Sequence, residues 1–146
     1  MQRRSWRDDV LLGGVMSVAL ALACNSKPGS GGSGSPGASA AADIVTDAGA
    51  LLKEYKDNEV AADQKYKGKV IQISGVVGEV RKGFSDQIYV TVGTGAAFEL
   101  PMAQCFFDES ASAKAATLKQ GDMVTIKGRV DGLILNVVVQ DSVFIP

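Results

Sequence analysis

The side chains that could carry out covalent or acid–base chemistry are few in this sequence and do not form a group. It contains no histidine, which is both the commonest general base and the commonest metal ligand. No motif sets a nucleophile beside a base, and no cluster has the spacing of metal ligands. Carboxylates could act in pairs as acid and base, but no spacing singles out two of the following: Asp63, Glu79, Asp86, Glu99 and Asp122. We therefore expect a protein that is not an enzyme and that needs neither a cofactor nor a metal.

The first of two cysteines, Cys24, stands at the end of an apolar run that follows three arginines. This run, Val10 to Ala23, is shorter than the roughly 20 residues that cross a bilayer as a helix and has the size of a signal-peptide core. The segment "ALAC" that ends at Cys24 resembles the bacterial lipobox, where a signal peptidase cuts before an acylated cysteine. The resemblance implies a lipoprotein signal peptide over residues 1–23 and a lipid on Cys24. An ordinary signal peptide followed by an unmodified cysteine is the alternative.

Residues 24–42 are expected to form a flexible tether between this lipid and the rest of the chain. Gly, Ser, Ala and Pro dominate the segment after Lys27, and such a composition cannot build a core. Lipoprotein modification supplies two or three acyl chains, which is enough for stable anchoring. Asn25 is not the aspartate that retains lipoproteins at the inner membrane of enteric bacteria. We therefore expect an exported, lipid-anchored envelope protein, on the outer membrane and facing the periplasm rather than on the inner membrane.

The second cysteine, Cys105, lies in the apolar segment "AQCFF". With Cys24 committed to lipid it is the only thiol left, so we expect no internal disulfide in spite of the oxidising compartment. No histidine or lysine lies nearby in the sequence to lower its pKa. We therefore predict a buried, unreactive thiol.

The charge balance disfavours a general attraction to phosphate backbones. The chain of 146 residues has a formal net charge of −1, and removal of residues 1–23 with their three arginines and two aspartates makes it −2. Nucleic-acid-binding domains are usually basic. A nucleic acid is therefore a disfavoured partner, although local lysines remain available.

The residues after the tether predict one folded domain over residues 43–146, mainly β with two helices. Helical spacing of apolar residues predicts a helix from an N-cap at Asp43 to an end at Asn58. A second helix is predicted after Asp108, ending at a left-handed Gly121. The expected strand regions are residues 69–80 (bent or bulged at Gly75), 87–92, 97–107, 122–132 and 133–145, the last two joined by a turn at Asp131–Gly132.

This order of elements is that of the OB-fold, a five-stranded Greek-key barrel. The expected barrel has an N-terminal helix and a second helix between strands three and four. Periodicity alone leaves a small sandwich or an SH3-like barrel as alternatives. The helix between strands three and four favours the OB-fold.

Two segments, "NEVAADQKYKGKVIQISGVVGEV" and "LKQGDMVTIKGRVDG", resemble a family of bacterial OB-fold proteins, mostly exported or lipidated, known as tRNA-anticodon-binding-like (tRNA_anti-like). The resemblance covers Leu51 to Phe144. Where relatives often have a second cysteine this chain has Ser142, which removes any family disulfide to Cys105. The residues that carry the resemblance are Asn58, Ala62, Asp63, Tyr66 to Lys69, Gly75, Cys105, Leu118, Gly121, Val124, Ile126 and Gly128.

OB barrels usually bind ligands across strands two and three and the loops beside them. On this chain that rule selects a cationic and aromatic set that could stack bases or sugars: Tyr89 and Thr91 on strand two, Arg81, Lys82 and Phe84 before it, and Lys127 and Arg129 facing outward on strand four. The alternative is a solvated strand face. The basic segment Lys65 to Lys69, "KYKGK", is interpreted as a solvated helix exit rather than a binding patch.

Two function classes follow from these patterns. The first is a non-catalytic, membrane-anchored OB-fold module that binds an envelope protein, a peptide or a glycan. The second is an OB-fold domain that binds nucleic acid or an oligonucleotide. Location and charge favour the first class. Salt-dependent retention on single-stranded DNA or RNA would favour the second.

Overall fold

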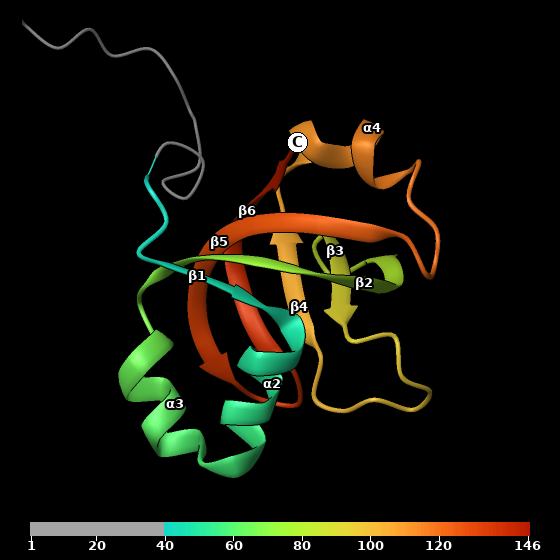
Figure 1. The fold of residues 1–146 in the computed structure, drawn as a ribbon. Helices are drawn as coiled ribbons and strands as arrows, with labels where there is room; N and C mark the ends of the chain where they lie inside the picture. The colour runs from blue at the N-terminus through green and yellow to red at the C-terminus, as the bar shows by residue number, and fades with distance from the viewer. Residues whose placement is uncertain (1–39) are drawn as a thin grey trace, which may run out of the picture. The chain divides into compact units, whose positions relative to one another are not determined.

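A computed structural model describes residues 40–146 of the chain. The predicted signal peptide, Cys24 and nearly all of the predicted tether lie outside the described residues. The elements, shown in Figure 1, are β1 (Ile44–Asp47), α2 (Ala48–Asp57), α3 (Glu59–Tyr66), β2 (Val70–Lys82), β3 (Ile88–Gly93), β4 (Ala103–Phe107), the 3₁₀ turn η1 (Glu109–Ala111), α4 (Ser112–Ala115), β5 (Met123–Leu133) and β6 (Val137–Ile145).

Strands β2 to β6 close into a five-stranded barrel. Going round it, β2 pairs with β3, β3 with β4, β4 with β6, β6 with β5, and β5 returns to β2. All of these pairs are antiparallel except β4 with β6, which is parallel. This is the OB-fold predicted from the order of elements. The helical hairpin of α2 and α3 lies at one end of the barrel, and α4 with the C-terminus lies at the other (Figure 1).

The start of the folded chain differs from the prediction, because Ile44–Asp47 is a strand and not the first turn of a helix. β1 pairs in parallel with the first half of β2, from Ile44 opposite Ile71 to Asp47 opposite Ser74. The N-cap is therefore Asp47, whose carboxylate accepts a hydrogen bond from the Ala50 amide at 2.9 Å, and not Asp43. The predicted end at Asn58 is confirmed, and the same residue caps a second helix, α3.

The helical hairpin closes its end of the barrel with apolar side chains. Leu51, Leu52 and Tyr55 of α2 are buried, as the helical spacing predicted, and Tyr66 of α3 joins them. The rings of Tyr55 and Tyr66 stack with their centroids 6.1 Å apart. Each hydroxyl donates to a carboxylate of the other helix, Tyr55 to Asp63 and Tyr66 to Glu54, both at 3.1 Å. These bonds satisfy the only polar atoms that the two buried rings carry.

Strand β2 carries its irregularity later than predicted. Inward-facing residues continue through Gly75, which pairs with Val124 in regular register, and the bulge falls between Val77 and Val80. Gly75 serves close packing instead, because a Cβ there would lie 2.7 Å from the Ala48 Cβ and 2.6 Å from a Val92 methyl. The glycine therefore lets the first turn of α2 approach the barrel wall.

The second half of the barrel has the predicted strands in shorter form and with different connections. β4 begins at Ala103, beyond Pro101, rather than at Ala97, and β6 begins at Val137 rather than at Leu133. The helix after Asp108 is only the short η1–α4 pair; Gly121 has the expected left-handed backbone (φ 95°) but lies in a turn beyond it. The β5–β6 turn lies at residues 134–136 and not at Asp131–Gly132, because β5 continues through a bulge at Gly132. In the described part of the chain, no helix is long and apolar enough to cross a membrane.

Candidate ligand-binding face

The outer surface of β2, β3 and β4 brings a cation and two aromatic rings into one row. Arg81 pairs with Tyr89 across the β2–β3 ladder, and Tyr89 pairs with Phe106 across the β3–β4 ladder. Because side chains alternate along a strand, all three face out of the barrel while their neighbours Val90, Cys105 and Phe107 face into it. The rings of Tyr89 and Phe106 are half-buried, with centroids 5.6 Å apart. We call Arg81, Tyr89 and Phe106 the ladder row.

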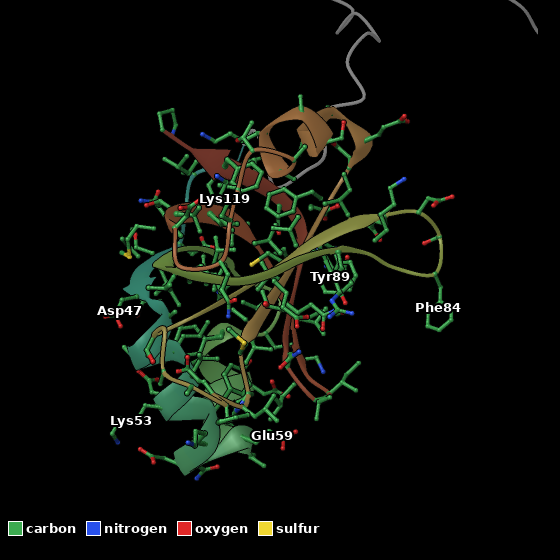
Figure 2. All side chains as sticks on the ribbon, turned by 90° about the vertical axis from the view of Figure 1, so that its right-hand side faces the viewer. Asp47, Lys53, Glu59, Phe84, Tyr89 and Lys119 are labelled. Atoms are coloured by element: carbon green, nitrogen blue, oxygen red, sulfur yellow. The ribbon has the colours of Figure 1, made fainter. Side chains whose placement is uncertain are left out.

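Phe84 extends this row beyond the barrel. It lies in the loop between β2 and β3, and its side chain is fully exposed. Figure 2 shows Tyr89 and Phe84 on the same side of this hairpin, Tyr89 close to the barrel and Phe84 at the loop tip. Phe84 therefore adds an exposed aromatic ring at the tip of the hairpin that carries Arg81 and Tyr89.

The two cations of this region are paired but accessible. Arg81 contacts Glu79 at 2.9 Å and Lys82 lies 3.8 Å from Asp86, with about two thirds of each basic side chain exposed (62% and 69%). Exposed ion pairs of this kind contribute little to stability, so either cation can exchange its partner for an anionic ligand at small cost.

The structure places Thr91 differently from the surface position that its outward parity predicted. It is 5% exposed, and its hydroxyl accepts a hydrogen bond from the Glu79 amide at 2.8 Å. That bond holds the backbone at the β2 bulge. Thr91 therefore stabilises the backbone beneath the binding face, and its buried hydroxyl is not available to a ligand.

Lys127 and Arg129 also do not join the ladder row. They lie on β5 opposite Gln72 and Val70, so the length of β2 separates them from Arg81. The Lys127 ammonium donates to the Ala40 carbonyl at 2.8 Å, and Arg129 pairs with Asp141 at 3.1 Å. Outward parity was predicted correctly for these residues, but they face out of a different side of the closed barrel.

The residues that carry the family resemblance near "KYKGK" have structural contacts. Asn58 caps α3 through the Ala61 amide at 3.1 Å, and Gly68 turns the chain into β2 with φ 78°. Lys65 donates to both carboxylate oxygens of Glu54 at 2.7 and 2.8 Å. This segment therefore holds α3 against α2 and leads the chain into the barrel.

Within residues 40–146 the second thiol is buried, and each of the five carboxylates considered above has a contact partner. Cys105 is completely buried, as predicted, and burial raises the pKa of its thiol to about 12, while a hydrogen bond with Ser142 acts in the other direction. No three metal-ligating side chains come together in this part of the chain. Asp63, Glu79, Asp86, Glu99 and Asp122 contact Tyr55, Arg81, Lys82, Thr94 and the Lys119 amide, respectively.

Sequence reasoning missed Phe106. It lies in "CFF", where only the register of β4 against β3 shows that the first phenylalanine faces outward beside Tyr89. The sequence did contain a signal for it. If Cys105 and Phe107 face into the barrel, alternation along the strand requires Phe106 to face out.

Comparison with known proteins finds a matching family and similar solved structures. The model of the tRNA_anti-like family matches residues 11–143. A solved structure named "putative nucleic acid-binding lipoprotein", from Klebsiella pneumoniae subsp. pneumoniae, matches with 23% identity and a TM-score of 0.56, covering 69% of this chain and 91% of that one. This likeness supports the fold.

Other matches are more distant. A chain of the Stn1–Ten1 complex of S. pombe is 18% identical, with a TM-score of 0.39, over 52% of this chain and 57% of that one. Asparaginyl-tRNA synthetase of Entamoeba histolytica is 21% identical, with a TM-score of 0.39, over 54% of this chain and 21% of that one. No curated protein matches the sequence.

Proposed function

Because the chain belongs to the tRNA_anti-like family, we propose that it is an envelope lipoprotein whose OB barrel binds a single-stranded oligonucleotide on the β2–β3–β4 face without catalysing a reaction. The observation that carries the proposal is the ladder row, in which Arg81, Tyr89 and Phe106 are consecutive partners across three strands. The comparisons favour this class over the peptide or glycan class, since the similar Klebsiella protein is named for nucleic-acid binding and as a lipoprotein.

The chemistry of the row suits single strands rather than duplexes. Nucleobases stack on aromatic side chains, and each such contact contributes about 1–3 kcal/mol with little dependence on sequence. Most of the surface of Tyr89 and Phe106 is buried, which holds the two rings in place, and the remainder is exposed. Arg81 beside them can contact a phosphate or stack on a base.

The net charge of the chain limits affinity but does not exclude this ligand. With a formal charge of −1, long-range attraction to nucleic acid is weak. Binding must then depend on stacking and on the few local cations, Arg81 and Lys82. We expect modest affinity and a shallow dependence on salt, because few phosphates are neutralised.

The test is fluorescence anisotropy with the full chain in detergent and a fluorescein-labelled strand of about eight deoxythymidines, a length within the range bound by one OB-fold. Tyr89→Ala should weaken binding by about fivefold or more. Arg81→Ala should weaken binding and make the dependence of the logarithm of the binding constant on the logarithm of salt concentration shallower by about one, the value for one lost phosphate contact. Lys53→Ala is the matched control: it removes the same charge from α2, away from Tyr89 (Figure 2), and should leave affinity unchanged.

Equal losses for Arg81→Ala and Lys53→Ala would mean that only net charge matters and would contradict a defined face. Absence of binding to deoxythymidine and to a mixed RNA strand of the same length would contradict the proposed ligand.

A protein or peptide partner in the envelope is a second candidate, favoured by apolar side chains at the loop tips around the face. The exposed side chains of this kind are Phe84, Phe98, Leu100, Ile134 and Leu135. Crosslinking in intact cells, followed by identification of the crosslinked species, separates the candidates. A specific protein crosslinked through Phe84 or Leu135 replaced by a photoreactive residue would favour this one.

A further inference from the structure

A groove continues the ligand-binding face toward the β3–β4 loop. It encloses about 520 Å³ between the β2 bulge, the loop before β4 and the β5–β6 turn. This volume is in the range of small-molecule pockets. Its floor includes Thr91, two residues beyond Tyr89 on the same side of β3, so it is contiguous with the ladder row. The lining residues used below are Gly78, Glu79, Phe98, Glu99, Met102 and Asn136.

Phe98 stands at the rim of this groove in a backbone conformation that suits glycine. Its φ is 59°, in the left-handed region that bulky residues rarely adopt, and its side chain is fully exposed. The loop is fixed around it, because the Glu99 carboxylate accepts hydrogen bonds from the Thr94 amide at 2.7 Å and the Thr94 hydroxyl at 2.9 Å. An exposed phenylalanine held with backbone strain contributes nothing evident to folding. Such strain is often found where a side chain contacts a ligand.

The walls of the groove combine apolar surface with a fixed amide. Met102 covers the space above Gly78, where a Cβ would lie 2.5 Å from the Met102 methyl. Asn136 accepts a hydrogen bond from the Met102 amide at 3.0 Å and donates one to Gln104 at 3.3 Å. Because its amide group has two hydrogens, the second can donate to a ligand carbonyl.

The charges of the groove select against an anionic group. Glu79 and Glu99 both line it, and each carboxylate would repel a phosphate. A neutral, flat heterocycle with hydrogen-bonding edges can contact the Phe98 ring, the Met102 thioether and the Asn136 amide without being repelled by the two carboxylates. A nucleobase has that chemistry, whereas the phosphates of the same strand would lie toward Arg81 and Lys82.

We propose that Phe98 and this groove form a second subsite, which takes an unstacked base adjacent to the one on Tyr89 and Phe106. The inference rests on the proposed function and deepens it, since it makes Phe98 a ligand contact and gives the bound strand a defined path from the β2–β3 loop to the β3–β4 loop.

The test compares Phe98→Ala and Phe98→Gly in the full chain, using labelled deoxythymidine strands of about four and eight nucleotides. Both variants should weaken binding of the longer strand by about fivefold or more, the size of one lost stacking contact. Phe98→Gly should keep or raise the thermal midpoint, because glycine adopts this backbone without strain. Val60→Ala, which shortens an exposed apolar side chain on α3, is the control and should change neither quantity.

The outcomes separate this inference from the proposed function. If the Phe98 variants bind within twofold of the unmodified chain while Tyr89→Ala weakens binding, the second subsite is wrong and the ligand-binding face stands. If the unmodified chain binds no strand of either length, both proposals fail together. A reduced gain from four to eight nucleotides in the Phe98 variants alone supports the subsite.

Discussion

Gly75 lies where the first turn of α2 packs against the barrel wall. A Cβ at this position would approach the Ala48 Cβ to 2.7 Å, a Val92 methyl to 2.6 Å and the Gly93 carbonyl oxygen to 2.8 Å. The Gly93 oxygen belongs to the backbone, and the Ala48 Cβ is bonded directly to the backbone of α2. Neither atom can therefore move away by a side-chain rotation. We predict that Gly75→Ala loses about 1–3 kcal/mol of unfolding free energy, and Gly75→Val more, measured by urea denaturation.

Gly83 offers the matched control for this prediction. A Cβ there would be no closer than 3.5 Å to any neighbour, which is ordinary van der Waals contact, and its backbone is not left-handed. Gly83→Ala should therefore change stability little. Equal stability losses at Gly75 and Gly83 would contradict close packing as the cause of the loss at Gly75.

Ser142 and Cys105 form a buried polar pair inside the barrel. Both are nearly inaccessible (3% and 0%), and Ser142 lies close enough to the thiol to lower its pKa, while the Ser142 hydroxyl donates to the Val139 carbonyl at 3.3 Å. Ser142→Cys should therefore form a disulfide with Cys105 under oxidising conditions and raise the free energy of unfolding by about 2–4 kcal/mol. Mass spectrometry without reductant detects the lost hydrogens, and Ser142→Ala controls for loss of the hydroxyl. Two free thiols in the oxidised, folded variant would contradict the geometry.

The helical hairpin adds a pH-dependent contact at the element scale. A hydrogen bond from Lys65 and a weaker one from Tyr66 lower the pKa of Glu54 against the opposing effect of burial. A carboxyl whose pKa is lower in the folded state adds stability above its unfolded pKa of 4.5, and this stability is lost as the pH falls through the folded value.

A double-mutant cycle of Glu54→Gln and Lys65→Gln should thus give a coupling energy at pH 7 that disappears in acid. Both groups are exposed, so solvent screens the pair and the coupling should be small. Thermal unfolding between pH 3 and pH 7, a range that brackets the carboxyl titration, measures it. A coupling energy of the same size at pH 3 and pH 7 would mean that the Glu54 and Lys65 side chains interact through packing of their methylene groups rather than through charge.

Elements with long periodic patterns were predictable from the sequence, and those decided by distant partners were not. Along β5, the alternation of apolar and polar residues correctly predicted that Val124, Ile126 and Val130 face the barrel interior. β1 was missed because Ile44 also fits the helical stripe that continues at Ala48, and only parallel pairing with β2 makes the segment extended. The turn was misplaced because Asp131–Gly132 is a strong local signal, while the register of β5 against β6 puts a bulge there.

The candidate site was predictable to a similar degree. Alternation along the strand identified Tyr89 as an outward residue. Arg81 was predicted in the loop before that strand, whereas the structure places it on β2, opposite Tyr89. Alternation also places Lys127 and Arg129 on the outside of the barrel, but it does not show that they lie on a different side from Tyr89. Only the order of the strands around the closed barrel shows this. Phe98 had no sequence signal, since its importance lies in a left-handed backbone within an irregular loop.

At the scale of the whole molecule, the lipid and the barrel are expected to be independent parts. The described fold begins at Ile44, and the ladder row, the groove and the helical hairpin all lie within it. Cys24 lies outside the described residues and belongs to the proposed tether. A change at Cys24 should therefore alter where the protein is found without altering what its barrel binds.

We predict that Cys24→Ser abolishes incorporation of labelled palmitate, because the thiol that carries the acyl groups is gone, and that it blocks removal of residues 1–23, because the peptidase cuts before an acylated cysteine. Cys105→Ser is the control, since it removes the other thiol, which lies buried in the barrel, and should leave palmitate labelling intact. The thermal midpoint of the Cys24→Ser protein should equal that of the unmodified chain when both are measured in detergent. Palmitate labelling of Cys24→Ser, or labelling that persists until Cys105 is also replaced, would contradict a lipid anchor at Cys24.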